Sequence, residues 1–202
     1  LTSEGYFTYL KEFKGGHSLN AVAGYSYFEK NGENFNAENY DFGVEGLKYW
    51  DLESGSYLTD GKAKMGSKKD ITERLFALYA RANYSYNDKY MVTATIRHEG
   101  SSKFAAENRW GNFWALSGGW RVSGEEFMKE FDWVNDLKIR FGYGVTGNND
   151  FDASYMANTL SRDQYWMLPS GSWAYVYGPS SNVNPYLGWE EKKEWNIGVD
   201  YS

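Results

Sequence analysis

The feature that most restricts the fold of this 202-residue chain is a two-residue alternation of apolar and polar side chains around a short turn at residues 87–89. Before the turn, every second residue is apolar or aromatic: Phe76, Leu78, Ala80, Ala82, Tyr84 and Tyr86. After it, the same holds for Tyr90, Val92, Ala94 and Ile96. Because neighbouring side chains of a strand point to opposite faces, this period predicts a β-hairpin with one apolar and one polar face.

Such a two-faced hairpin suits either a soluble sheet or a membrane β-barrel, whose lipid side is apolar and whose lumen is polar. Aromatic residues make up 19% of the chain, with 18 Tyr and 9 Trp. The aromatic belts of a membrane barrel would account for this excess, as would a sugar-binding sandwich. No run approaches the roughly 18 apolar residues of a membrane helix, so helical membrane spans are excluded.

The same alternation predicts about seven strands and hence an all-β, antiparallel fold. The strands are expected at residues 6–13, 17–29, 74–87, 90–99, 110–123, 137–147 and 189–202. Short connections alternate with two long loops at about residues 31–73 and 147–188. This asymmetry is typical of outer-membrane barrels, in which periplasmic turns are short and extracellular loops are long.

The positions of Tyr and Trp agree with a barrel that crosses a bilayer. Near the short turns, the apolar face carries Tyr84, Tyr86, Tyr90, Trp120 and Tyr201. Toward the long loops it carries Tyr25, Tyr27, Tyr143 and Trp189. An odd number of strands leaves unpaired edges, which are costly in lipid. We therefore expect a transmembrane segment of a larger barrel.

One connection, residues 124–136, has the pattern of a helical turn. Ser123 could cap its first turn, and Glu126 follows at the spacing of a capping box. The adjacent Glu125 and Glu126 are expected to interact with the positive end of this turn.

Several segments resemble, in the same order, the SusC/RagA family of TonB-dependent outer-membrane transporters. The matching segments are residues 80–86, 97–104 (Arg-His-Glu-Gly-Ser-Ser-Lys-Phe), 110–113, 119–123, 136–140, 143–148 and 184–198. The resemblance implies a bacterial outer-membrane protein that imports oligosaccharides or peptides. It also implies a SusD-like surface lipoprotein as a lid, and the TonB complex as a partner through an N-terminal region. That region, the plug domain and most strands of a barrel of roughly 22 strands would lie outside these 202 residues.

Two other functions are compatible with the residue pattern. A secreted, aromatic-rich, carbohydrate-binding β-sandwich would bury the apolar face that a barrel exposes to lipid. A passive porin would need no energy-coupling partner.

Aromatic side chains of the second long loop are candidate contacts for a ligand or a lid, since aromatic faces stack on sugar rings and anchor protein interfaces. They are Tyr165, Trp166, Trp173, Tyr175 and Tyr177. The alternative is that they form a small core within the loop itself.

Charged residues on the polar face are candidate contacts for solute or plug in the lumen. They are Arg81, Arg97, Lys138, Arg140, Glu190 and Glu194, together with Asp200. The alternative is a hydrated wall in which opposite charges pair across strands.

No catalytic, metal or cofactor site is expected. The chain has no Cys, no Gly-x-Ser-x-Gly sequence and two distant histidines, His17 and His98, which we expect to be solvated. Oxygen-bearing residues 148–152 lack the spacing of a calcium loop and are expected to form a turn. The net charge of −6 argues against a nucleic-acid partner.

Overall fold

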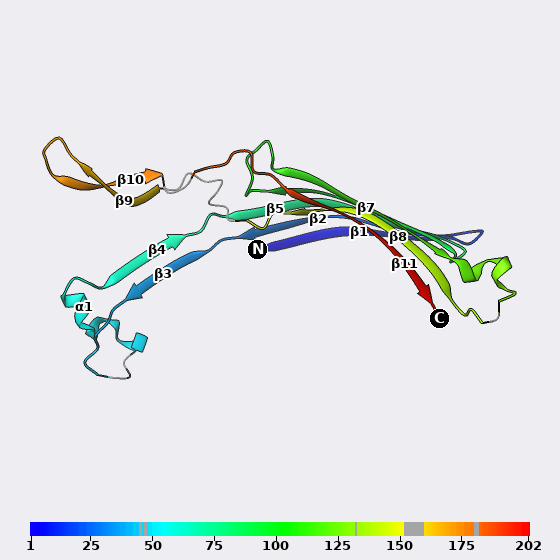
Figure 1. The fold of residues 1–202 in the computed structure, drawn as a ribbon, viewed down its shortest axis with the longest axis horizontal. Helices are drawn as coiled ribbons and strands as arrows, with labels where there is room; N and C mark the ends of the chain where they lie inside the picture. Colours follow the sequence, from blue (N-terminus) through cyan, green and yellow to red (C-terminus); the bar gives the residue numbers. More distant parts are fainter. Residues whose placement is uncertain (45, 47, 132, 152–159, 180–181) are drawn as a thin grey trace. The chain divides into compact units, whose positions relative to one another are not determined.

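The computed structural model describes residues 1–44, 46, 48–131, 133–151, 160–179 and 182–202. Its main element is a seven-stranded sheet in the order β1-β2-β5-β6-β7-β8-β11, with β1 and β11 at its edges (Figure 1). The strands are β1 (Thr2–Phe13), β2 (His17–Lys30), β5 (Glu73–Tyr86), β6 (Tyr90–Ser101), β7 (Trp110–Arg121), β8 (Leu137–Asn148) and β11 (Glu190–Tyr201). The all-β, antiparallel class predicted from the sequence is confirmed.

Each observed strand differs by a few residues from its predicted range. The largest difference is at β1, which begins at Thr2 instead of residue 6. The extra residues pair in register with β2, Thr2 lying opposite Phe28. They were missed because Thr2–Gly5 carries no apolar alternation.

The cross-strand register places the alternating residues on common faces of the sheet. Tyr84 lies opposite Val92, and Ala94 lies in turn opposite Leu116 of β7. The resulting apolar face is widely exposed, with Leu78 at 50%, Ile96 at 54% and Leu116 at 48%. A sandwich would bury such side chains, whereas a barrel wall presents them to lipid.

The turns at one end of the sheet are tight. Asn87 and Asp88 both have positive φ, at 49° and 54°, and Gly15 and Gly16 at 87° and 81°. Two successive residues of this kind form the hairpin turns whose twist matches that of the strands. We call this end of the sheet the short-turn end and the opposite end the long-loop end.

The two predicted long loops contain further hairpins. Residues 30–72 form a separate compact unit with β3 (Glu33–Glu38), β4 (Lys64–Lys69), η1 (Lys48–Trp50), η2 (Leu52–Ser54) and α1 (Ser56–Thr59). The second loop contains the hairpin of β9 (Leu160–Met167) and β10 (Trp173–Pro179). In the portion of the chain that is described, no helix is long and apolar enough to cross a membrane.

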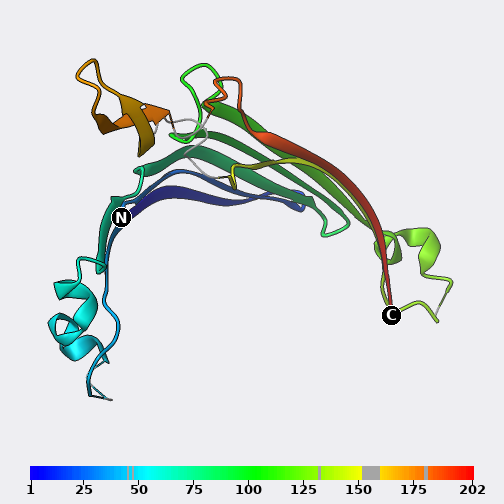
Figure 2. The same ribbon diagram turned by 60° about the vertical axis from the view of Figure 1, so that its left-hand side comes forward.

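The buried core of the sheet is small and most of it lies toward the long-loop end. The apolar side chains at 7% exposure or less are Ala77, Phe104, Phe113 and Val145 toward that end, and Val122 after β7 at the short-turn end. Figure 2 shows the curvature of the sheet that supports them. A core of this size would not compensate for the exposed apolar face in water, which again favours a lipid environment.

Candidate functional site

The polar face of the sheet carries paired charges on its central strands. The Arg97 guanidinium donates two hydrogen bonds of 2.8 Å to the carboxylate of Glu99, and one of 3.4 Å to the hydroxyl of Ser26 on β2. Arg81 donates through Nε to the Thr95 hydroxyl at 3.2 Å. These bonds hold both cations against the sheet.

The same face continues to the edge strand β11. Arg140 of β8 pairs with Asp200 through an Nη2–Oδ1 distance of 2.7 Å. Glu190 accepts a hydrogen bond of 3.0 Å from the Asn148 amide, and Glu194 pairs with Lys192 at 2.5 Å. Because the side chains of the two ion pairs are about half exposed or more, each pair contributes only about 0–1 kcal/mol.

A polar hollow of about 400 Å³ lies on this face toward the short-turn end. Its lining includes Asn20, Asn83, Thr93, Lys138, Arg140 and Asn196. Donors and acceptors from five strands thus face one space that is large enough for several water molecules, which suits a hydrated lumen.

The predicted luminal residues therefore share one face, but most of them already have a partner within the wall. The register places Lys138 opposite Asp200 and Arg140 opposite Gly198. The arrangement supports at least one role for these residues, that of a hydrated wall in which charged side chains pair with one another. Whether a plug or a solute also contacts these side chains stays a prediction.

At the long-loop end, four aromatic rings form a cluster that we call the rim core: Phe104, Phe113, Phe151 and Trp189. Phe104 is 2% exposed, and its ring lies 4.9 Å from that of Phe151 and 5.2 Å from that of Trp189. Phe113 approaches Trp189 at 5.1 Å. The cluster joins the connection after β6, the end of β8 and the start of β11.

Lys103 and Ser101 make polar contacts beside the rim core. The Lys103 ammonium donates to the Phe151 carbonyl at 3.1 Å and lies 3.5 Å from Glu73 Oε1. Ser101, 1% exposed, accepts hydrogen bonds from the Lys103 backbone and the Asn149 amide. These contacts attach the segment after β8 to the connection after β6 and to the start of β5.

The prediction for Trp189 is wrong. Alternation placed it in the aromatic belt on the apolar face, but it precedes β11, donates its Nε1–H to the Arg109 carbonyl at 2.9 Å and packs in the rim core. The alternating pattern was extended one residue beyond the start of the strand. The sequence signal for the rim core was that its four aromatic residues lie within or a few residues from the long-loop ends of predicted strands.

The aromatic candidates of the second loop lie on the β9–β10 hairpin. Tyr165 lies opposite Tyr175, with ring centroids 4.0 Å apart, and the Arg162 guanidinium lies 5.0 Å from the Tyr175 ring. Trp166 lies opposite Ala174, and so on the other face of the hairpin. Tyr165, Trp166, Trp173, Tyr175 and Tyr177 are each more than half exposed.

The hairpin thus brings Tyr165, Trp173 and Tyr175 together on one face and separates Trp166 from them. Packing within the loop accounts for the Tyr165–Tyr175 pair but leaves the tryptophan rings accessible. Their role as ligand or lid contacts stays a prediction.

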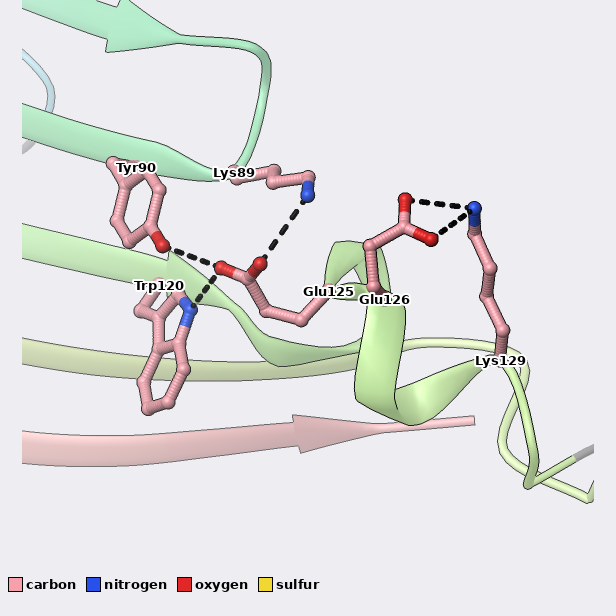
Figure 3. A network of polar contacts seen from close by, with 6 residues as sticks. All are labelled: Lys89, Tyr90, Trp120, Glu125, Glu126 and Lys129. Atoms are coloured by element: carbon pink, nitrogen blue, oxygen red, sulfur yellow. Dashed lines mark hydrogen bonds and ion pairs between the residues drawn. The ribbon is translucent and has the colours of Figure 1, made fainter.

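At the short-turn end, the connection after β7 is attached to the sheet by Glu125 (Figure 3). Its carboxylate accepts hydrogen bonds from the Tyr90 hydroxyl at 2.5 Å, Trp120 Nε1 at 3.1 Å and Lys89 Nζ at 3.2 Å. The bonds from Tyr90, Trp120 and Lys89 hold the pKa of Glu125 below its ordinary value.

The predicted capping box is wrong. The connection contains two 3₁₀ turns, η3 (Val122–Gly124) and η4 (Glu126–Met128), and neither has a side-chain cap. The Ser123 hydroxyl instead donates to Asp136 Oδ1 at 2.9 Å. Glu126 pairs with Lys129 within its own turn, and Glu125 binds side chains of the sheet (Figure 3).

The two histidines are not simply solvated, contrary to the prediction. His98 lies parallel to the Trp110 ring at 4.7 Å and its Nδ1 is 2.8 Å from the Asn112 side chain. His17 stacks on Tyr86 at 4.5 Å, with Nδ1 2.7 Å from the Tyr84 hydroxyl. Both belong to aromatic clusters at opposite ends of the apolar face.

No group of three or more potential metal-ligating side chains occurs among the residues for which the structure gives positions. In the predicted turn after β8, the Asn148 side chain accepts a hydrogen bond from the Asp150 backbone at 2.9 Å. This contact is the turn chemistry that Asn provides.

An antiparallel sheet with a broad apolar face, a hydrated polar face, tight turns at one end and long hairpin-bearing loops at the other defines a wall segment of a transmembrane β-barrel. Comparison with known families agrees, because the family described as "TonB dependent receptor-like, beta-barrel" matches residues 2–202. The chain therefore belongs to the TonB-dependent receptor β-barrel family. Membership places it in the bacterial outer membrane.

Among similar curated proteins, TonB-dependent receptor P39 of Formosa agariphila is 34% identical over 99% of this chain. TonB-dependent receptor SusC of Bacteroides thetaiotaomicron is 33% identical over 70% of it. The matched regions are 18% and 14% of those two proteins. The chain thus spans about a fifth or less of the length of its relatives.

Solved structures of the RagAB peptide importer share the fold. In the "closed-closed" state the TM-score is 0.82, and in the "open-open" state it is 0.74, each with 22% identity over 99% of this chain. The match covers 21% and 20% of those chains. The predicted resemblance to SusC/RagA transporters, and the assignment of this sheet to a larger barrel, are confirmed.

Proposed function

We propose that the protein containing this chain is an active importer of oligosaccharides or peptides across the outer membrane, and that this segment forms wall, rim and outer loops. The proposal rests on one observation: the sheet has an apolar face of the kind that contacts lipid and, opposite it, a charged, hydrated face. The chain that forms this sheet belongs to the TonB-dependent receptor family. No bond-making step is needed. The relatives are named as receptors and importers, which supports transport over catalysis.

In this proposal, a SusD-like lipoprotein covers the long-loop end, and the TonB complex supplies energy through a region outside these residues. The names of SusC and of the RagAB peptide importer support a two-component importer of this type. Arg81, Arg97, Lys138, Arg140, Glu190 and Glu194 would line the lumen against a plug. Ion pairs within the wall would keep these charges hydrated but fixed in position.

The aromatic hairpin β9–β10 would contact the lid or the solute. Trp173 and Trp166 provide a test because they lie on opposite faces of the same hairpin and are almost equally exposed, at 64% and 66%. If only the face bearing Tyr165 and Tyr175 binds, Trp173→Ala lowers solute affinity or lid association and Trp166→Ala does not. Equal effects, or none, would contradict a one-sided binding role.

The function itself is tested by uptake in cells that express the complete protein. Labelled maltooligosaccharides and labelled oligopeptides are supplied separately, with and without deletion of TonB and with a protonophore. The proposal expects uptake of one solute class that stops when TonB or the proton gradient is removed. Uptake that continues unchanged would identify a passive porin instead.

A further inference from the structure

We propose that the connection between β7 and β8, residues 122–136, is an interfacial anchor that inserts aromatic side chains into the phospholipid leaflet at the short-turn end. The observation behind it is that the described residues of this connection expose large apolar side chains. Phe127 is 57% exposed, Phe131 45% and Trp133 68%. The inference rests on the membrane placement of the sheet in the proposed function.

The segment is attached to the sheet near both ends. Near its start, Glu125 is bound by Tyr90 and Trp120 of the sheet and by Lys89 of the turn before β6 (Figure 3). Near its end, Asp136 accepts hydrogen bonds from Arg121 at 2.8 Å and from Ser123 at 2.9 Å, and its backbone exchanges hydrogen bonds with that of Ser202. All three aromatic residues lie between these two attachments.

The attachment through Glu125 leads to the apolar face of the sheet, whereas Arg121, which binds Asp136, lies on the polar face opposite Lys138. Tyr90 and Trp120, which hold Glu125, are cross-strand partners on the apolar face. From the connection, Phe131 contacts Trp133, whose ring lies 6.3 Å from that of Tyr201 on β11. Aromatic side chains of the connection are therefore in contact with the lipid side of the wall at Tyr201.

A phospholipid interface fits these exposed aromatic side chains better than a polar protein surface does. Aromatic residues prefer the headgroup region, where apolar ring atoms meet acyl chains and polar edges meet water. Carboxylates at positions 125, 126 and 136 are each paired with a basic side chain, which reduces their cost near lipid. The anchor would fix the depth of the short-turn end in the bilayer.

The test uses single cysteines, which the 202 residues lack. Phe127→Cys and Phe131→Cys are introduced into the complete protein, labelled with an environment-sensitive NBD fluorophore and reconstituted into phosphatidylcholine nanodiscs. Quenching by nitroxide lipids, labelled near the headgroup end of the acyl chain, is compared with quenching by aqueous iodide. Lys129→Cys, on the same connection, is the matched control, and the unsubstituted protein gives the background.

We expect blue-shifted emission at positions 127 and 131 relative to 129, with quenching mainly by nitroxide lipid. Iodide quenching equal to that at position 129 would overturn the anchor, as would protection from both quenchers, which would indicate a protein partner. Val199→Cys, on the apolar face of β11, separates the two claims. If position 199 is quenched by lipid while 127 and 131 are not, the anchor alone fails; if 199 is also water-accessible, the membrane placement fails.

Discussion

Replacing Phe104 by alanine should open the rim core without unfolding the barrel wall. The ring is 2% exposed and lies within 5.2 Å of the rings of Phe151 and Trp189, measured between centroids. Removing a fully buried phenylalanine costs about 3–5 kcal/mol, from lost transfer free energy and the cavity left behind. Since about 1.4 kcal/mol is a tenfold change, local opening should become roughly 10²- to 10⁴-fold more frequent.

Hydrogen exchange measures this opening directly. The amide of Ser101 donates to the Arg109 carbonyl at 3.1 Å, and that of Ser102 to the Arg74 carbonyl at 2.8 Å. Both amides should lose protection in Phe104→Ala, while amides in the middle of β6 keep theirs. Phe7→Ala removes the same atoms from a side chain that is 72% exposed, and should leave the rim unchanged.

The reasoning would be refuted if exchange at residues 101–109 in Phe104→Ala matched that of the unsubstituted protein. Equal loss of protection along β6 would also contradict it, since it would mean that the rim core and the wall unfold together.

Three further predictions concern the wall and its turns. The folded-state pKa of Glu125 is depressed, so its stabilising effect is complete above about pH 4.5 and is lost as the pH falls through the folded value. Proteolysis of residues 122–136 should therefore accelerate in acid. Glu125→Gln should reduce this pH dependence, and the remainder should come from Asp136 and Glu126, whose pKa values are also lowered. Gly147→Ala should destabilise the protein by about 1–3 kcal/mol, because the new methyl group overlaps the buried ring of Phe113. Gly118→Ala is the control: the atom nearest to its new methyl group is 3.9 Å away, so the urea unfolding midpoint should stay unchanged. A double-mutant cycle on Arg140 and Asp200 should give a coupling of about 0–1 kcal/mol, because both side chains are about half exposed; a coupling several times larger would show that the pair is desolvated.

The strands of the main sheet could be predicted because their signal is local. The polarity of each side chain of β6 from Tyr90 to Arg97 indicates the face of the sheet on which it lies. The register with β5 and β7 then follows from matching the apolar faces. The hairpin of β3 and β4 gave no such signal, since Glu33–Glu38 and Lys64–Lys69 are polar or charged at most positions. Their pairing depends on backbone hydrogen bonds, which sequence periodicity does not report.

The parts of the site that were missed depend on competition between distant partners. Ser123 has the spacing of a helix cap, but Asp136, thirteen positions later, is its actual acceptor. Glu125 was expected to interact with a helical turn, whereas the nearest donors came from two other strands. Trp189 belongs to the rim core because of its distance to Phe113, which lies far away in the sequence. Local patterns cannot rank such alternatives.

The central claim is that one face of this sheet contacts lipid and the other lines a hydrated lumen. The most direct test is a nitroxide scan along β6, from Val92 to Arg97, in the complete protein in a bilayer. We predict oxygen accessibility that peaks at Val92, Ala94 and Ile96, alternating with accessibility to an aqueous nickel complex at the residues between them. Uniform exposure of both sets to the nickel complex, with no two-residue period, would contradict the account.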